Sequence, residues 1–357
     1  ILVCTMNADA QNYEKLWENV EELKAKDLPR SAIGEVEKIW KMAERKGDFA
    51  WATKAKFERM MLRAEISTDS MSADLESISK ELSGLEKKNK KDKHSKTQVQ
   101  ILHALLGDAY RRLGDMSMSN KDLREESKRI SKEHFALALT DWDALAEASA
   151  ADYSPLMKTL GRESDTRMYG NDMLNVIASY VIKAQYSIGE KENYELYESL
   201  SKYYASRGNR NGALLMKIGA MTSRLYQYEG GVKISQYAYR DSMLVMARQN
   251  KDIEAGADVY VKLLNIIPDQ ERREKLSIAE EALRTYPNSP HSEHYKLVKA
   301  RLNQGRVWAN VIGGAYNPVK VKVEYSHVKN CRISFYNHAT KRMEAVKYLS
   351  IKPCDET

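Results

Sequence analysis

The sequence predicts a mainly α-helical protein built from helical hairpins and followed by a smaller β region. Apolar residues recur every three to four positions through most of the chain, which is the spacing of one face of a helix. The 357 residues include only 17 Gly and 7 Pro, as long helices require. After Leu302 apolar and polar residues alternate, as in a half-buried strand. We therefore expect a helical-hairpin solenoid over residues 11–303, then a partial antiparallel β-sandwich over residues 304–357.

The first predicted hairpin lies near the start of the chain. Its first helix carries an apolar stripe at helical spacing, formed by Tyr13, Leu16, Trp17, Val20 and Leu23. Asp27-Leu28-Pro29 interrupts this stripe, because proline ends or begins a helix. A second stripe, Ile33, Val36, Trp40 and Ala43, predicts a partner helix that stops at Gly47.

The same pattern repeats along the chain. One stripe runs over residues 102–113 and is predicted to end at Gly114-Asp115, and another runs over 214–225. Short polar segments separate the stripes: Gly47-Asp48, Gly114-Asp115, Gly189-Glu190, Gly208-Asn209 and Asn250-Lys251-Asp252. This rhythm predicts roughly fourteen helices, or about seven antiparallel pairs.

Two fragments resemble the tetratricopeptide repeat. In Leu106-Gly107-x-x-Tyr110, glycine lets a partner helix approach and tyrosine fills the gap. Ala282-Leu283 with Pro287 resembles the end of the second helix of a repeat, where proline stops the helix. Neither match extends over a full repeat of about 34 residues. We therefore describe the array as tetratricopeptide-like, with unrelated helical pairs as the alternative.

The β region begins near Gly305. Val319, Val321, Val323 and Tyr325 alternate with charged residues, which predicts a strand. A turn at Lys329-Asn330 leads into a second strand over 331–336, and we expect further strands over 307–312 and 343–351. Since three or four strands do not complete a sandwich, we expect the chain to be a fragment of something longer.

Charge does not indicate a nucleic-acid partner. The formal net charge is +7, but the run from Lys87 to Lys96 alone holds six Lys and one Asp, so most of the excess lies there. Elsewhere Lys and Arg do not alternate with aromatic residues in the way that would follow a phosphate backbone. We interpret the run as a solvated loop, with polyanion binding as the alternative.

The first ten residues have features of an export signal. Ile1, Leu2 and Val3 are apolar, and Ala8-Asp9-Ala10 has the small-x-small form of a signal-peptidase site. We interpret residues 1–10 as the remnant of a signal peptide; an ordinary frayed terminus is the alternative. Val3 is not small, so a lipid anchor on Cys4 is not supported. Without a run of 18 apolar residues, no transmembrane segment is expected.

Cysteine usage gives no disulfide framework. Once residues 1–10 are removed, only Cys331 and Cys354 remain of the three Cys. They either pair in an oxidising compartment or stay as free thiols.

No motif predicts catalysis, a cofactor or a metal. The chain lacks phosphate-binding glycine loops and the usual hydrolase and kinase signatures. Its seven His are scattered; His291 and His294 are nearest to a metal pair, but they follow a helix-start signal and suit an exposed first turn. Solvated helix faces account for the carboxylates Asp141, Asp143, Glu147, Glu280 and Glu281. We expect a protein that is not an enzyme.

One aromatic segment is a candidate protein-binding surface. It contains Tyr194, Tyr197, Tyr203 and Tyr204. Solenoids often bind partners through aromatic concave surfaces. Packing between helices is the alternative, and the more favoured one.

Four stretches give the chain a resemblance to a known family. They are His134–Leu139 leading to Leu145-Ala146, Asp165–Leu174, Gly208–Leu214, and Asn317-Pro318 followed by Val323, Tyr325, Val328 and Arg332-Ile333. In this order the chain resembles the amino-terminal helical region of the large bacterial alpha-2-macroglobulin-like proteins, followed by the start of their first macroglobulin domain. Gly170 and Met173 depart from the pattern, where bulkier or more Leu-like residues are expected.

The resemblance implies an exported endopeptidase inhibitor that traps proteases, in the periplasm or at the cell surface of a bacterium. Family members carry a bait segment and often a thioester in Cys-x-Glu-Gln. Cys354-Asp355-Glu356-Thr357 is similar only by chance, because Thr357 has no carboxamide carbon to form the thioester. The partners implied are proteases, through domains outside this chain, and an envelope protein. A stand-alone tetratricopeptide-like binding module in the cell envelope is the alternative.

Overall fold

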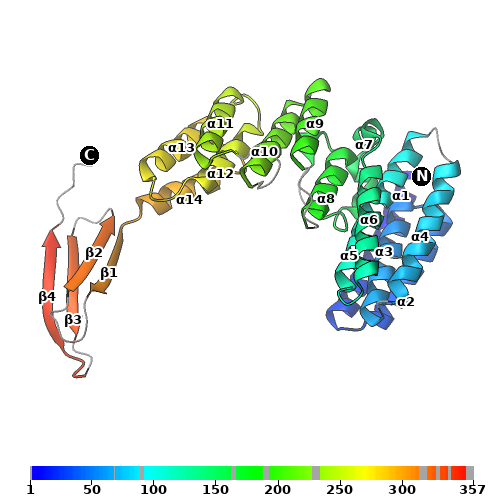
Figure 1. Ribbon diagram of the computed structural model, residues 1–357, viewed down its shortest axis with the longest axis horizontal. Coiled ribbons are helices and arrows are strands. Elements are labelled where there is room, and N and C mark those ends of the chain that lie inside the picture. The colour runs from blue at the N-terminus through cyan, green and yellow to red at the C-terminus, as the bar shows by residue number, and fades with distance from the viewer. Residues whose placement is uncertain are drawn as a thin grey trace. The chain divides into compact units, whose positions relative to one another are not determined.

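A computed structural model describes residues 2–67, 69–88, 92–161, 166–187, 193–226, 234–312, 320–326, 330–336 and 339–350 (Figure 1). Side chains are described from Asn12 onward. The chain divides into two compact units, residues 1–234 and residues 235–357. The described residues contain fourteen α-helices, the number expected from the repeated apolar stripes.

The first unit contains helices α1 to α10. Their bounds are α1 Leu2–Ala25, α2 Pro29–Lys46, α3 Phe49–Ile66, α4 Asp69–Lys88, α5 Lys93–Met116, α6 Lys121–Leu137, α7 Trp142–Glu147, α8 Met173–Ser187, α9 Asn193–Ser206 and α10 Arg210–Tyr226. Two short 3₁₀ helices, η1 Ala150–Leu156 and η2 Arg167–Tyr169, lie between α7 and α8. Helices α1 to α5 each pack against the next helix in the chain, and α9 packs against α10.

The predicted turns at the start of this unit are confirmed. Helix α2 begins at Pro29, and Asp27 before it has a left-handed backbone with φ of 56°. Gly47 ends α2 with φ of 69°, and Asp48 then caps α3 by accepting a hydrogen bond of 3.1 Å from the backbone N–H of Trp51. Glycine and aspartate therefore punctuate the chain as their conformational preferences require.

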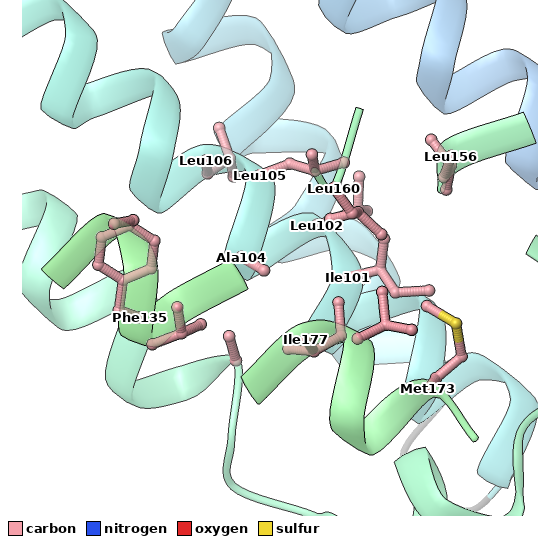
Figure 2. Close-up of a cluster of buried hydrophobic side chains, with 14 of the residues drawn as sticks. Ile101, Leu102, Ala104, Leu105, Leu106, Phe135, Leu156, Leu160, Met173 and Ile177 are labelled. Atoms are coloured by element: carbon pink, nitrogen blue, oxygen red, sulfur yellow. The ribbon is translucent and has the colours of Figure 1, made fainter. Parts of the chain in front are cut away.

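Helix α5 lies in the main core of this unit. Residues 101, 102 and 104–106 are all buried, and their side chains meet Phe135 of α6, Leu156 of η1 and Met173 and Ile177 of α8 (Figure 2). A second core, between α1, α2 and α3, includes Val20, Val36, Ile39 and Leu62. Val20, Val36, Leu102 and Leu106 belong to predicted stripes, whereas Ile39 and Leu62 are not in any of them.

The prediction that the stripe in α5 ends at Gly114-Asp115 is wrong. The helix continues to Met116, and the connection to α6 lies at Ser117 to Asn120. A Cβ atom at position 114 would lie 3.4 Å from the carbonyl oxygen of Arg124 in α6. Gly114 therefore lies inside α5, within contact distance of α6, and not in a turn.

The second unit begins with four helices. Their bounds are α11 Gln236–Gln249, α12 Gly256–Ile266, α13 Arg272–Thr285 and α14 Ser292–Asn303. Helix α11 packs against α12, α12 against α13, and α13 against α14. Arg240 of α11 is 5% exposed, and its guanidinium group donates to Glu271 at the start of α13 and to Glu274 one turn later. The segment Asn250-Lys251-Asp252 lies between α11 and α12, as predicted.

The change from helix to strand near Gly305 is confirmed. Helix α14 ends at Asn303, and the strands are β1 Arg306–Ile312, β2 Lys320–Ser326, β3 Asn330–Tyr336 and β4 Met343–Ser350. Strand β1 pairs antiparallel with β2, and β3 with β4. The described strands form two separate two-stranded sheets, so a sandwich is not seen among them.

The model also bears on membrane insertion. In the part of the chain that the structure describes, every helix is too short or too polar to cross a bilayer. This agrees with the expectation from the apolar run lengths.

Candidate functional site

The four tyrosines of the candidate surface lie on α9, where each is engaged by a neighbouring element. Tyr203 donates a hydrogen bond of 2.7 Å from its hydroxyl to Asp143 of α7, and its ring meets Trp142 edge-on. Burial, followed by the bond to Asp143, raises the pKa of Tyr203 to about 12. Arg207 lies over the same ring, 5.6 Å from its centroid. Tyr203 thus connects α9 to α7.

Tyr204 is 2% exposed, so its ring is not available to a ligand. Its hydroxyl donates a hydrogen bond of 3.0 Å to Asp172. The same carboxylate oxygen accepts the backbone N–H of Asn175 at 2.9 Å and so caps the start of α8. Burial, with the charge of Asp172, raises the pKa of Tyr204 well above its usual range.

Tyr194 and Tyr197 face α10. The guanidinium carbon of Arg224 lies 5.4 Å from the ring centroid of Tyr194. The ring of Tyr197 occupies the space that a side chain at Gly219 would need. Tyr203 and Tyr204 meet in an edge contact of 6.1 Å, but the four rings contact three different elements. These contacts are those of packing between helices.

Two stretches of the family resemblance come together beside Tyr204. Gly170, with φ of 87°, ends η2, and Asn171 follows with φ of 57°. A Cβ atom at Gly170 would lie 3.8 Å from the side-chain amide of Asn209. Asn209 itself accepts the backbone N–H of Gly212 at 2.9 Å and so caps α10. The turn at 166–172 therefore lies against the turn at 208–212, although about forty residues separate them in the sequence.

A hollow that the sequence did not predict lies on α4. It has a volume of about 430 Å³ and lies along the outer face of α4, beside one tyrosine of α5. Its lining consists of Glu76, Ser79, Lys80, Ser83, Gly84, Lys87 and Tyr110. Ser79, Ser83 and Gly84 of α4 contribute small residues to this lining, and Glu76, Lys80 and Lys87 contribute charged ones. The signal available in the sequence is the spacing of Ser79, Ser83 and Gly84, which places them on one helix face.

The carboxylates that we expected on solvated faces form ion pairs between helices. Asp141 accepts from Lys96 at 2.8 Å and also caps α7. Glu147 pairs with Lys93 at 2.5 Å, and Glu280 pairs with Lys299 at 2.9 Å. The first two bonds involve lysines of the basic run from Lys87 to Lys96, so that run is partly engaged with acidic side chains. Residues 89–91 of it lie outside the described residues.

The histidines considered as a metal pair lie at the start of α14. His291 is 3.2 Å from a carboxylate oxygen of Asp258 through its Nε2 atom, and burial lowers the pKa of His294. Within the described ranges, three or more side chains of His, Cys, Asp or Glu are nowhere grouped to hold a metal ion. The seven His are scattered in the sequence, but His103 and His134 meet in the fold through their ring nitrogens.

Several predicted features lie outside the described residues. They include Gly189-Glu190, Asn317-Pro318, Val328, and the segment with Cys354, Glu356 and Thr357. Ala8 and Ala10 lie within α1, but their side chains, like those of Cys4 and Cys331, are not described.

Comparisons with known proteins found no relative of this chain. The chain matches no protein-family model, no curated protein and no solved structure. The family resemblance therefore stays a prediction from the residues that carry it.

Proposed function

We propose that this chain is a non-catalytic scaffold, the amino-terminal helical region of an exported alpha-2-macroglobulin-like endopeptidase inhibitor. In such a protein the helical region supports or targets the inhibitor and does not touch the active site of the trapped protease. The proteases would be bound by domains outside this chain.

The order of the elements carries the proposal. The fourteen helices α1 to α14 of the described residues are followed within three residues by antiparallel strand pairs that start at Arg306. The resemblance requires this order at this place. The contact between the turns at 166–172 and 208–212 adds support, because it brings together two of the four stretches that carry the resemblance.

The distribution of charge also supports a scaffold role. Buried or half-buried charges join one helix to another: Asp74 of α4 accepts from Arg59 and Arg63 of α3, and Arg240 joins α11 to α13. Such pairs fix the geometry of an array. Export to the periplasm or cell surface rests on the apolar start and on Ala8 and Ala10.

The family assignment is tested on the gene. The reading frame that encodes this chain is followed past the codon of Thr357, and the mass of the intact protein is measured from cells. The proposal expects several further β domains and a Cys-x-Glu-Gln. A stop codon close to that position, with an intact mass near 40.9 kDa, would contradict it.

One observation favours the alternative, a stand-alone tetratricopeptide-like binding module. Gly107 lets Phe135 of α6 approach α5, as glycine does in the repeat motif, and Tyr110 borders the hollow on α4. A module of this kind binds a defined partner at one to one. Binding of a purified partner that Ser83→Arg abolishes, and that the surface control Lys38→Arg leaves unchanged, would favour it over the scaffold.

A further inference from the structure

Two histidines meet between α5 and α6. The Nδ1 atom of His103 lies 2.8 Å from the Nδ1 atom of His134, which is a hydrogen-bond distance. His103 is 4% exposed, and His134 is half-buried. The pair joins two neighbouring helices from positions 31 residues apart.

The neighbouring carboxylate fixes the protons of this pair. The Nε2 atom of His103 lies 3.1 Å from Oε1 of Glu86 on α4. A carboxylate only accepts, so His103 carries its proton on Nε2 and its Nδ1 is a bare acceptor. His134 must then donate from its Nδ1. We assign these tautomers from the hydrogen-bond network. The bond between the rings needs one Nδ1 without a proton, so it is lost when both rings are protonated.

The two helices leave the rings no room to separate. One turn along α5 from His103, Gly107 lies directly against the ring of Phe135, the residue after His134. The hydroxyl of Ser131 donates a bond of 2.7 Å to the carbonyl oxygen of Gly107. Tyr110 stacks on His134 with ring centroids 5.6 Å apart. The repulsion between two protonated rings therefore cannot be relieved by a small shift of one helix.

Few charges are present to compensate a doubly protonated pair. The titratable groups that face it are Glu86 from α4 and Tyr110 from α5, while α6 contributes His134 itself. Burial lowers the pKa of His103, against the opposing effect of Glu86. Burial and the charge of His103 lower the pKa of His134 to about 4. A base whose pKa is lowered in the folded state costs stability as the pH falls below its unfolded value of about 6.5.

We propose that His103 and His134 form an acid-sensitive switch, which holds the α5–α6 hairpin closed while both rings are neutral and opens it when both are protonated. The switch acts on the first unit, whatever partner the protein binds. Acidification below about pH 6 exposes the core face of α6, including Phe135, before the rest of the chain unfolds.

Hydrogen exchange measured by mass spectrometry tests the switch on the full chain at pH 7.0 and pH 5.0, with the intrinsic pH dependence of exchange removed. The opening constant of α5 and α6 amides is expected to rise about tenfold or more at pH 5.0. In His134→Asn, whose amide keeps a donor near the Nδ1 position, that rise is expected to shrink by about a factor of ten. The control His94→Asn changes an exposed histidine of α5 and keeps the full rise.

An equal rise in His134→Asn and in the unchanged chain would overturn the proposal. Should His134→Asn not fold, long-range proton–nitrogen NMR of the unchanged chain decides the question. The expected spectrum shows His103 protonated on Nε2 and His134 on Nδ1, with neither ring titrating above pH 6. Ordinary titration of both rings near pH 6.5 would contradict the switch.

Discussion

Phe135 in α6 occupies the space that a side chain at Gly107 in α5 would need. A Cβ atom built on Gly107 would lie 2.6 Å from Cδ1 of Phe135, far inside van der Waals contact. Phe135 is fully buried, so its ring cannot move out into solvent. The approach of the two helices therefore depends on the missing side chain.

This contact predicts the effect of a single methyl group. Gly107→Ala is expected to lower the free energy of unfolding by about 1–3 kcal/mol, because overpacking exceeds the gain in helix propensity. The control is Gly34→Ala on α2, where nothing lies within 4 Å of the new Cβ atom. That change is expected to raise the free energy of unfolding by about 0.5–1 kcal/mol. Urea unfolding measures both, and a stabilising effect at position 107 would contradict the packing.

Local chemistry made most of the fold predictable. Pro29, Gly47, Asp48 and Gly208 end or begin elements where the sequence predicts it, because each has a conformational preference of its own. The predicted turn at Gly114 was wrong, because the sequence does not distinguish a glycine inside a helix from a glycine in a turn. How the strand pairs meet each other depends on contacts that local pattern does not encode.

The burial of the Asp108 carboxylate predicts how a second substitution changes the stability of the protein. Burial would raise the pKa of Asp108, but Arg112 and Arg111, each donating to it at 2.8 Å, lower it overall. Asp108→Asn is expected to lower the free energy of unfolding by about 1–3 kcal/mol. Asp115→Asn removes a 64% exposed partner of the same Arg111 and is expected to cost less than about 0.5 kcal/mol.

The pH dependence of the Asp108 contribution follows from its lowered pKa. The contribution is present above the unfolded value of about 4 and is lost as the pH falls through the lower folded value. The difference in unfolding free energy between Asp108→Asn and the unchanged chain is therefore expected to be constant from pH 7 to about pH 4 and to shrink as the pH falls from about 4 to 3. A constant difference down to pH 3 would contradict this assignment.

Tyr204 and Tyr203 allow the candidate surface to be tested. Tyr204→Phe removes the buried donor to Asp172 and is expected to cost about 1–2 kcal/mol of unfolding free energy. Tyr203→Phe removes a half-exposed donor and is expected to cost about 0.5 kcal/mol or less. Thermal unfolding measures both. Equal costs would mean that the burial of Tyr204 is not maintained in solution.

The lowered pKa of Lys54 predicts that the free energy of unfolding rises with pH in mild alkali. Its ammonium group lies 3.9 Å from the ring centroid of Trp17 and 4.5 Å from that of Trp51, and burial lowers its pKa to about 8. The folded state therefore binds fewer protons than the unfolded state between about pH 8 and pH 10.5, so stability rises with pH there.

Substituting Lys54 distinguishes its effect on stability from the titration of other lysines. The rise is expected to be about 1 kcal/mol after allowing for solvent screening, and Lys54→Met is expected to abolish it. Lys80→Met, at a 75% exposed position, is expected to leave it unchanged. Unfolding midpoints at pH 7.5 and pH 9.5 measure the difference, and a rise that persists in Lys54→Met would contradict the assignment.

The candidate sites were less predictable than the fold. The tyrosines of α9 are close in sequence, but their directions depend on α7, α8 and α10, which come from distant segments. His103 and His134 show the opposite case, because they are far apart in sequence and in contact in the fold. Pairings of this kind follow from how helices pack, and periodicity identifies only the faces that pack.

The central proposal is tested most directly by a trapping assay on the intact protein that contains this chain. A general protease is incubated with it, and activity is measured on a small chromogenic peptide and on a large protein substrate. The account predicts that cleavage of the peptide is retained while cleavage of the large substrate is lost, because a trapped protease is enclosed with its active site free. Unchanged cleavage of both substrates, or loss of both, would contradict the account.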